Sequence, residues 1–126
     1  MSMTSEGLMI GRRAATSPES ERTWNMRRFL EAMQAEKLSR LGLHQAECLV
    51  VLRAGPMLAV RAAHRGWHAP NPCVGVLIRE GYACYVPPVE AGGPPSYAIT
   101  PAGEELLVQM QARPRVWRFL KKGGAV

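Results

Sequence analysis

The chain has 126 residues, which is enough for one domain but too few for two domains with a cleft between them. Hydrophobic residues make up 47% of the chain and can build a core, while 12 glycines and 10 prolines predict several turns. All ten acidic residues are glutamate, which excludes Asp-based triads, EF-hand loops and Asp ligands for magnesium. The net charge of +6 favours an anionic partner such as a nucleic acid.

Targeting signals and paired cysteines are not apparent in the sequence. No run of apolar residues has the length of a secretory signal or a membrane span. The odd set of Cys48, Cys73 and Cys84 fits reduced thiols better than a disulfide framework. We therefore expect a cytoplasmic protein without membrane contact. Residues 1–17 are expected to form a flexible arm, 18–112 the domain, and 113–126 a basic and apolar extension.

Three helical segments are expected in the first half. Ser17-Pro18 is a good N-cap and first position for a helix over 18–40, ended by Gly42. Its apolar stripe is Met26, Phe29, Leu30 and Met33. A second helix over 44–54 is expected to bury Cys48, Leu49 and Leu52 before Gly55-Pro56. A third, short helical segment is expected from Met57 to Arg65, with the alternative that it begins as a strand.

The second half predicts a helix, a hairpin and a last helix. Asn71-Pro72 starts a helix over 72–80 that is expected to bury Val74, Leu77 and Ile78 before Gly81. Residues 82–86 and 97–100 are expected to be strands joined by a glycine- and proline-rich turn. Thr100-Pro101 starts a helix to about 112, in which Gly103 is tolerated, and Pro114 should break or kink it. The fold class is therefore mainly α with a small β-hairpin (α+β).

Two stretches of the sequence resemble winged helix-turn-helix proteins. Residues 77–82 (LIREGY) are similar to the end of a recognition helix that runs into a wing. Residues 97–107 (YAITPAGEELL) resemble the return strand and helix of MarR-like and PadR-like regulators, and 43–52 resembles a MarR-like helix. The resemblance implies a winged helix-turn-helix over about 43–110, a DNA-binding transcriptional regulator of repressor type, and a homodimer.

The helix at 71–80 is then the expected reader of the major groove, because a helix fits that groove and its first turn can reach base edges. Phosphate contacts are expected from basic residues beside it. The candidate DNA-binding residues are Arg61, Arg65, His68, Asn71, Cys73, Gly75, Val76 and Arg79.

Two features depart from MarR-like proteins. Gly75 stands where a polar, base-reading side chain is common, and the wing, residues 82–103, has no Lys or Arg and a single Glu. The basic residues gather instead in 21–45 and 104–126, where they could contact phosphates. The alternative function is therefore a winged-helix module that docks a partner protein through its uncharged hairpin and apolar C-terminus.

The dimer is expected to use apolar residues outside the winged core, because a monomer would leave them in water. The candidate interface residues are Trp24, Phe29, Leu30, Met33, Trp117, Phe119 and Leu120.

No cofactor or metal site and no enzyme activity are expected. Pairs such as His44 and Cys48, or His64 and His68, lack the spacing of known metal sites. Cys73 lies at an expected helix N-terminus and could act as a redox switch, because that position lowers the pKa of a thiol. The favoured interpretation is that Cys73 is a small packing residue. Arg12-Arg13 is interpreted as part of a solvated tail, and the alternative is an arm that enters the minor groove of DNA. No nucleotide-binding or metalloprotease motif is present in the sequence.

Overall fold

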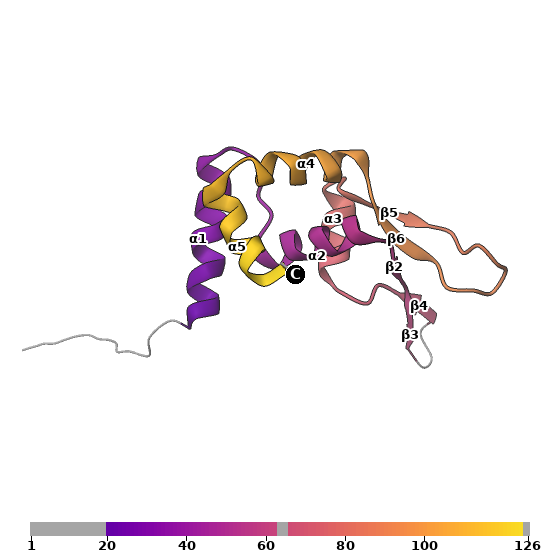
Figure 1. The fold of residues 1–126 in the computed structure, drawn as a ribbon. Helices are drawn as coiled ribbons and strands as arrows, with labels where there is room; N and C mark the ends of the chain where they lie inside the picture. The colour runs from indigo at the N-terminus through magenta and orange to yellow at the C-terminus, as the bar shows by residue number, and fades with distance from the viewer. Residues whose placement is uncertain (1–19, 63–65, 125–126) are drawn as a thin grey trace, which may run out of the picture.

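The computed structural model describes residues 20–62 and 66–124, and these form a mixed α+β fold of five helices and short antiparallel strands. Helices α1, α2, α4 and α5 form one end of the molecule, which we call the helical end. The strands lie at the opposite end, with α3 beside them, and together they form the strand end (Figure 1). This division positions every candidate residue discussed below.

Helix α1 spans Glu21–Ala35 and starts at Ser20, whose hydroxyl accepts a hydrogen bond from the Thr23 amide at 3.1 Å. The predicted end at residue 40 is wrong. Lys37 has a φ of 59°, and the Leu38 amide donates to the Met33 carbonyl, so the chain closes the helix with a left-handed residue. The predicted start at Ser17-Pro18 lies outside the described residues.

Helix α2, Leu43–Ala54, is the centre of the core. Gly42 precedes this helix instead of ending the first one, and its amide donates to the Gln45 side chain at 2.7 Å. The predicted helix over 44–54 is confirmed, as is burial of its apolar face. The buried residues are Leu43, Ala46, Cys48, Leu49 and Leu52.

The short helix predicted over 57–65 is wrong for the described residues, and the alternative that this segment begins as a strand is confirmed. β2 (Met57–Leu58) pairs with β6, and β3 (Val60–Ala62) pairs with β4 (Gly66–His68). Exposure alternates from Met57 to Val60, which is the period of a strand rather than a helix. The structure therefore has a second hairpin where a helix-turn-helix would have its first helix.

Helix α3, Cys73–Arg79, confirms the main features of the helix predicted at 71–80. The Asn71 side chain accepts from the Cys73 amide at 2.9 Å, and Gly81, with a φ of 88°, ends the helix. Val74 and Leu77 are buried as expected. Ile78, however, is 38% exposed, because it lies beside the strip of the helix that faces α2.

The predicted hairpin is confirmed. β5 (Ala83–Val86) and β6 (Ser96–Ile99) pair antiparallel, and the order of the three-stranded sheet is β2-β6-β5. Gly92, with a φ of 79°, lies in the turn between them. The sheet thus joins a strand that precedes α3 to two strands that follow it.

Helix α4 spans Pro101–Gln111, and the Thr100 hydroxyl accepts from the Gly103 amide at 3.1 Å. Gly103 is required rather than tolerated. A Cβ there would meet the Tyr82 carbonyl oxygen and would lie 2.8 Å from Ile99 Cγ1 and 3.2 Å from Leu49 Cδ1. Bare backbone at this position lets α4 approach the sheet and α2.

Helix α5, Pro114–Gly124, begins where the sequence predicted a break. Val116 and Leu120 are buried, and the helix packs on α1, α2 and α4. Its Phe119 ring meets the Phe29 ring edge to face, with 5.8 Å between centroids. Val116 and Leu120 of α5 therefore complete the core of the helical end.

Candidate nucleic-acid interface

The exposed side of α3 is formed by Gly75, Ile78 and Arg79, which we call the reader face. Its opposite side is anchored by Val74 and Leu77 against the core. A Cβ built on Gly75 would meet nothing within 4 Å. A flat surface can therefore approach the backbone of α3 closely at this point.

The other predicted residues of α3 are less available. Val76 is partly buried against the core, although the sequence predicted it to face outward. Cys73 is also partly buried, and burial, with a smaller contribution from Glu47, raises the pKa of its thiol. A reactive thiol at a helix N-terminus needs a lowered pKa, so the geometry favours the packing role for Cys73.

Asn71 uses its side-chain oxygen for the Cys73 amide and so serves mainly as a cap. Its side-chain NH₂ group has no protein partner among residues 20–62 and 66–124. Arg79 likewise has no carboxylate within 4 Å in this part of the chain. Asn71 and Arg79 are thus the hydrogen-bond donors that residues 71–80 offer to a ligand, while Glu80, which is exposed, adds a carboxylate beside them.

Two of the predicted phosphate contacts, Arg61 and His68, lie on the paired strands β3 and β4, which we call the ribbon and which comprise residues 60–62 and 66–68. The helical segment expected from Met57 to Arg65 would have placed Arg61 on a helix, which is wrong because Arg61 lies in a strand. Arg65 lies outside the described residues. Arg61 pairs in register with Trp67, and its guanidinium carbon lies 5.1 Å from the centroid of that ring.

The exposed ring of Trp67 was not among the predicted site residues. Assigning β3 and β4 as paired strands would have placed Trp67 beside Arg61. The signal that identifies these strands is the alternating exposure of their residues, and that exposure is known only from the fold. Leu58 and Val60 are also exposed here, Leu58 at 62%. The ribbon and its flanking strand thus present both apolar groups and one arginine.

The wing extends from the same end of the molecule as the ribbon (Figure 1). Tyr85 is 54% exposed, Val89 is fully exposed, and Glu90 is the only charged residue of 82–103. The wing therefore has no positive charge with which to follow a phosphate backbone.

Among the described residues of the helical end, four arginines lie beside carboxylates. Arg22 lies 3.1 Å from Glu47, and Arg113 lies 3.2 Å from Glu36. Arg27 and Arg28 both lie within 4 Å of Glu31. These pairs reduce the positive charge that residues 21–45 and 104–126 offer to a polyanion.

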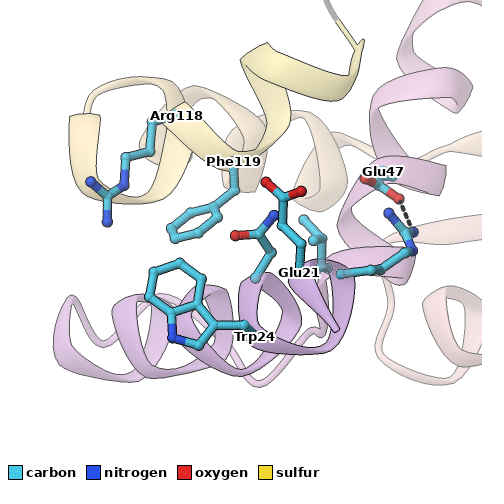
Figure 2. A pocket seen from close by; sticks show the side chains of 8 residues that line it. Glu21, Trp24, Glu47, Arg118 and Phe119 are labelled. Carbon is cyan, nitrogen blue, oxygen red and sulfur yellow. Dashed lines mark hydrogen bonds and ion pairs between the residues drawn. The ribbon is translucent and has the colours of Figure 1, made fainter. Parts of the chain in front are cut away.

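A groove of about 620 Å³ lies between α1, α5 and the start of α2 (Figure 2). Trp24 and Phe119 point into it from opposite helices, while Glu21 and the Arg22–Glu47 pair lie along its other side. The guanidinium carbon of Arg118 lies 4.9 Å from the centroid of the Phe119 ring. The groove is open, and both of its arginines already interact with neighbouring side chains.

The predicted dimer interface is largely internal to one chain. Phe29, Met33 and Leu120 are buried by the packing of α5 on α1, so a monomer does not leave them in water as the sequence argument assumed. Leu30, Trp117 and Phe119 are partly buried, and Trp24 is exposed. The C-terminal stretch therefore serves the fold of a single chain.

Residues 20–62 and 66–124 contain neither a membrane-spanning helix nor a cluster of metal ligands. None of their helices is both long and apolar enough to cross a bilayer. Within the same ranges, no group of three or more His, Cys or Glu side chains converges as metal ligands would.

Comparison with protein-family models, curated proteins and solved structures finds no match for this chain. The resemblance to MarR-like and PadR-like regulators therefore rests on the residues quoted from the sequence. Any function has to follow from the reader face, the ribbon and the distribution of charge.

Proposed function

We propose that this protein is a transcriptional regulator that binds double-stranded DNA and inserts α3 into the major groove. The observation that carries the proposal is the reader face. Val74 and Leu77 hold α3 on the core, while Gly75 leaves the backbone open on the opposite side. An α-helix fits the major groove when its backbone can approach the base edges.

Charge supports the same partner. The chain carries a net charge of +6, and Arg79, with no carboxylate within 4 Å among the described residues, extends the reader face. Asn71 adds an amide donor at the start of the helix. Since base-reading side chains are few, we expect phosphate contacts and DNA shape to contribute much of the affinity.

The first test is selection from a pool of randomised duplexes in the presence of competitor DNA. We expect enrichment of a defined sequence at physiological salt, and a steep loss of affinity as salt rises. Failure to enrich any sequence that resists competitor would refute sequence-specific binding.

Substitutions at Gly75 test the position of α3. Gly75→Glu and Gly75→Gln add side chains of the same size, and the open space at this position accommodates both. If α3 lies in the groove, Glu should weaken binding at least about tenfold more than Gln, because its carboxylate opposes the DNA phosphates. Thermal melting checks that both variants fold. A folded Glu variant that binds like the parent would place α3 outside the groove.

Docking of a partner protein is the second candidate, and the exposed apolar side chains of the strand end favour it. Leu58, Tyr85 and Val89 are exposed, and no base lies on the wing. Affinity capture from nuclease-treated lysate should be run with the parent and with Tyr85→Ser. A protein that the parent retains after nuclease treatment, and the variant loses, would support docking through the wing.

A further inference from the structure

The ribbon holds one arginine in a defined position. Arg61 on β3 and Trp67 on β4 are directly opposite each other in the antiparallel register, and their side chains therefore share one face of the hairpin. The guanidinium lies 5.1 Å from the Trp67 ring centroid. Val60 and His68, the next pair in register, face the other side.

This stacking leaves the hydrogen-bonding capacity of Arg61 available. The Arg61 side chain forms no hydrogen bond with another of the described residues, so its N–H donors are not used by the contact with Trp67. Within the described ranges, no carboxylate lies within 4 Å of Arg61. An oriented guanidinium with available donors matches the geometry of a phosphate group.

The surroundings of Arg61 differ from those of other arginines. Arg22, Arg28 and Arg113 all pair with glutamates at the helical end. Arg53 also stacks on a ring, that of Trp117 at 5.8 Å, but it donates to Gln111 as well. Arg61 combines a stacked guanidinium, an exposed site and a location at the same end of the molecule as α3.

We infer that the ribbon is the second DNA contact of this protein and takes the place of the wing, with Arg61 binding a backbone phosphate and Trp67 positioning its guanidinium. A two-stranded ribbon is narrow enough to lie along a DNA groove beside an inserted helix. The wing offers no base for this contact, because Glu90 is its only charge. The inference rests on the proposed DNA-binding function.

The experiment measures binding of a fluorescein-labelled duplex of mixed sequence, about 20 base pairs long, at salt concentrations from about 50 to 200 mM. Because a phosphate contact is independent of sequence, the target site need not be known. Arg61→Gln should weaken binding about three- to tenfold and reduce the slope of log K against log salt by about 1. Arg53→Gln, the matched arginine at the helical end, should change neither quantity.

Two more variants test the role of Trp67. Arg61→Lys keeps the charge and should keep the salt slope. Trp67→Leu also keeps the charge but removes the stacking, so affinity should fall while the slope stays near that of the parent. The double variant Arg61→Gln with Trp67→Leu should bind no more weakly than Arg61→Gln alone. Thermal melting of each variant shows whether it is folded.

The outcomes separate this inference from the proposed function. If Gly75→Glu abolishes binding while folded Arg61→Gln keeps the affinity and slope of the parent, the ribbon inference is wrong and α3 remains the reader. If Arg53→Gln reduces affinity and slope as much as Arg61→Gln, the effect is general charge and the inference is also wrong. If the parent binds no duplex at any salt concentration, both proposals fail.

Discussion

The two ends of this molecule use similar side chains in opposite ways. At the helical end, the Phe29 ring is buried, and four described arginines, Arg22, Arg27, Arg28 and Arg113, lie beside glutamates. At the strand end, Trp67 and Tyr85 are exposed, and Arg61 lies beside an aromatic ring with no carboxylate within 4 Å among residues 20–62 and 66–124. The difference teaches that apolar burial at the helical end accounts for stability, whereas the strand end retains apolar and cationic groups that a partner can contact.

The largest expected effect is at the helical end. Phe29→Ala removes a fully buried ring that meets Phe119 edge to face, and it should lower the free energy of unfolding by about 3–5 kcal/mol. Trp24→Ala, at an exposed position of the same helix, is the control and should cost far less. Urea unfolding, with light scattering at several concentrations, measures both stability and mass. If Phe29 instead belongs to a dimer interface, the variant would shift a dimer to a monomer of unchanged stability.

The buried thiol at the helical end predicts a pH dependence. Burial raises the pKa of Cys48 to about 11, and Cys73 adds to the shift. In the unfolded state the pKa of a cysteine thiol is about 8.5. Between that pH and about 11, the unfolded state therefore binds fewer protons than the folded state. The free energy of unfolding should therefore fall as pH rises, by about 2–3 kcal/mol in total.

The control for Cys48 is Cys48→Ala, which keeps all other titrating groups. Subtracting its urea-unfolding data at each pH from those of the parent isolates the thiol. Equal pH slopes for the two proteins above about pH 8.5 would contradict the prediction.

Cys84, exposed on β5, should also react with a thiol reagent well before Cys48 does.

A pair of glycines sharpens the comparison between the ends. Gly103→Ala places a Cβ against the Tyr82 carbonyl and near Ile99, and it should cost about 1–3 kcal/mol. The Cβ added by Gly75→Ala, on the reader face, meets nothing within 4 Å. This substitution should therefore raise the free energy of unfolding by about 0.5–1 kcal/mol. Thermal melting of both variants checks the opposite signs. A Gly103→Ala variant as stable as the parent would show that the close approach of α4 to the sheet is absent.

The smallest expected effect is on the wing. Glu90→Ala removes its only charge and should leave DNA affinity unchanged or slightly higher, because no base of the wing is lost. Measurement uses the same labelled duplex and salt range as for the ribbon. A folded variant that binds more than about threefold more weakly would indicate that the wing contacts DNA.

The sequence by itself determined the elements that have local signals. Asn71 and Gly81 mark the ends of α3, and Thr100-Pro101 marks the start of α4, because caps and left-handed residues act within a few positions of the chain. The hairpin of β5 and β6 was also predictable from its turn. These residues placed the reader face on α3, although Ile78 is more exposed, and Val76 and Cys73 are more buried, than the sequence predicted.

Only the tertiary structure decided the remaining features, because they depend on residues far apart in the chain. β2 becomes a strand by pairing Met57 with Tyr97, and no local pattern announces that partner. The second hairpin follows from β2 and places Arg61 on Trp67. In the same way, α5 returns to α1 and buries Phe29, which turns an expected dimer contact into the core of one chain. Long-range packing outweighs local propensity at each of these positions.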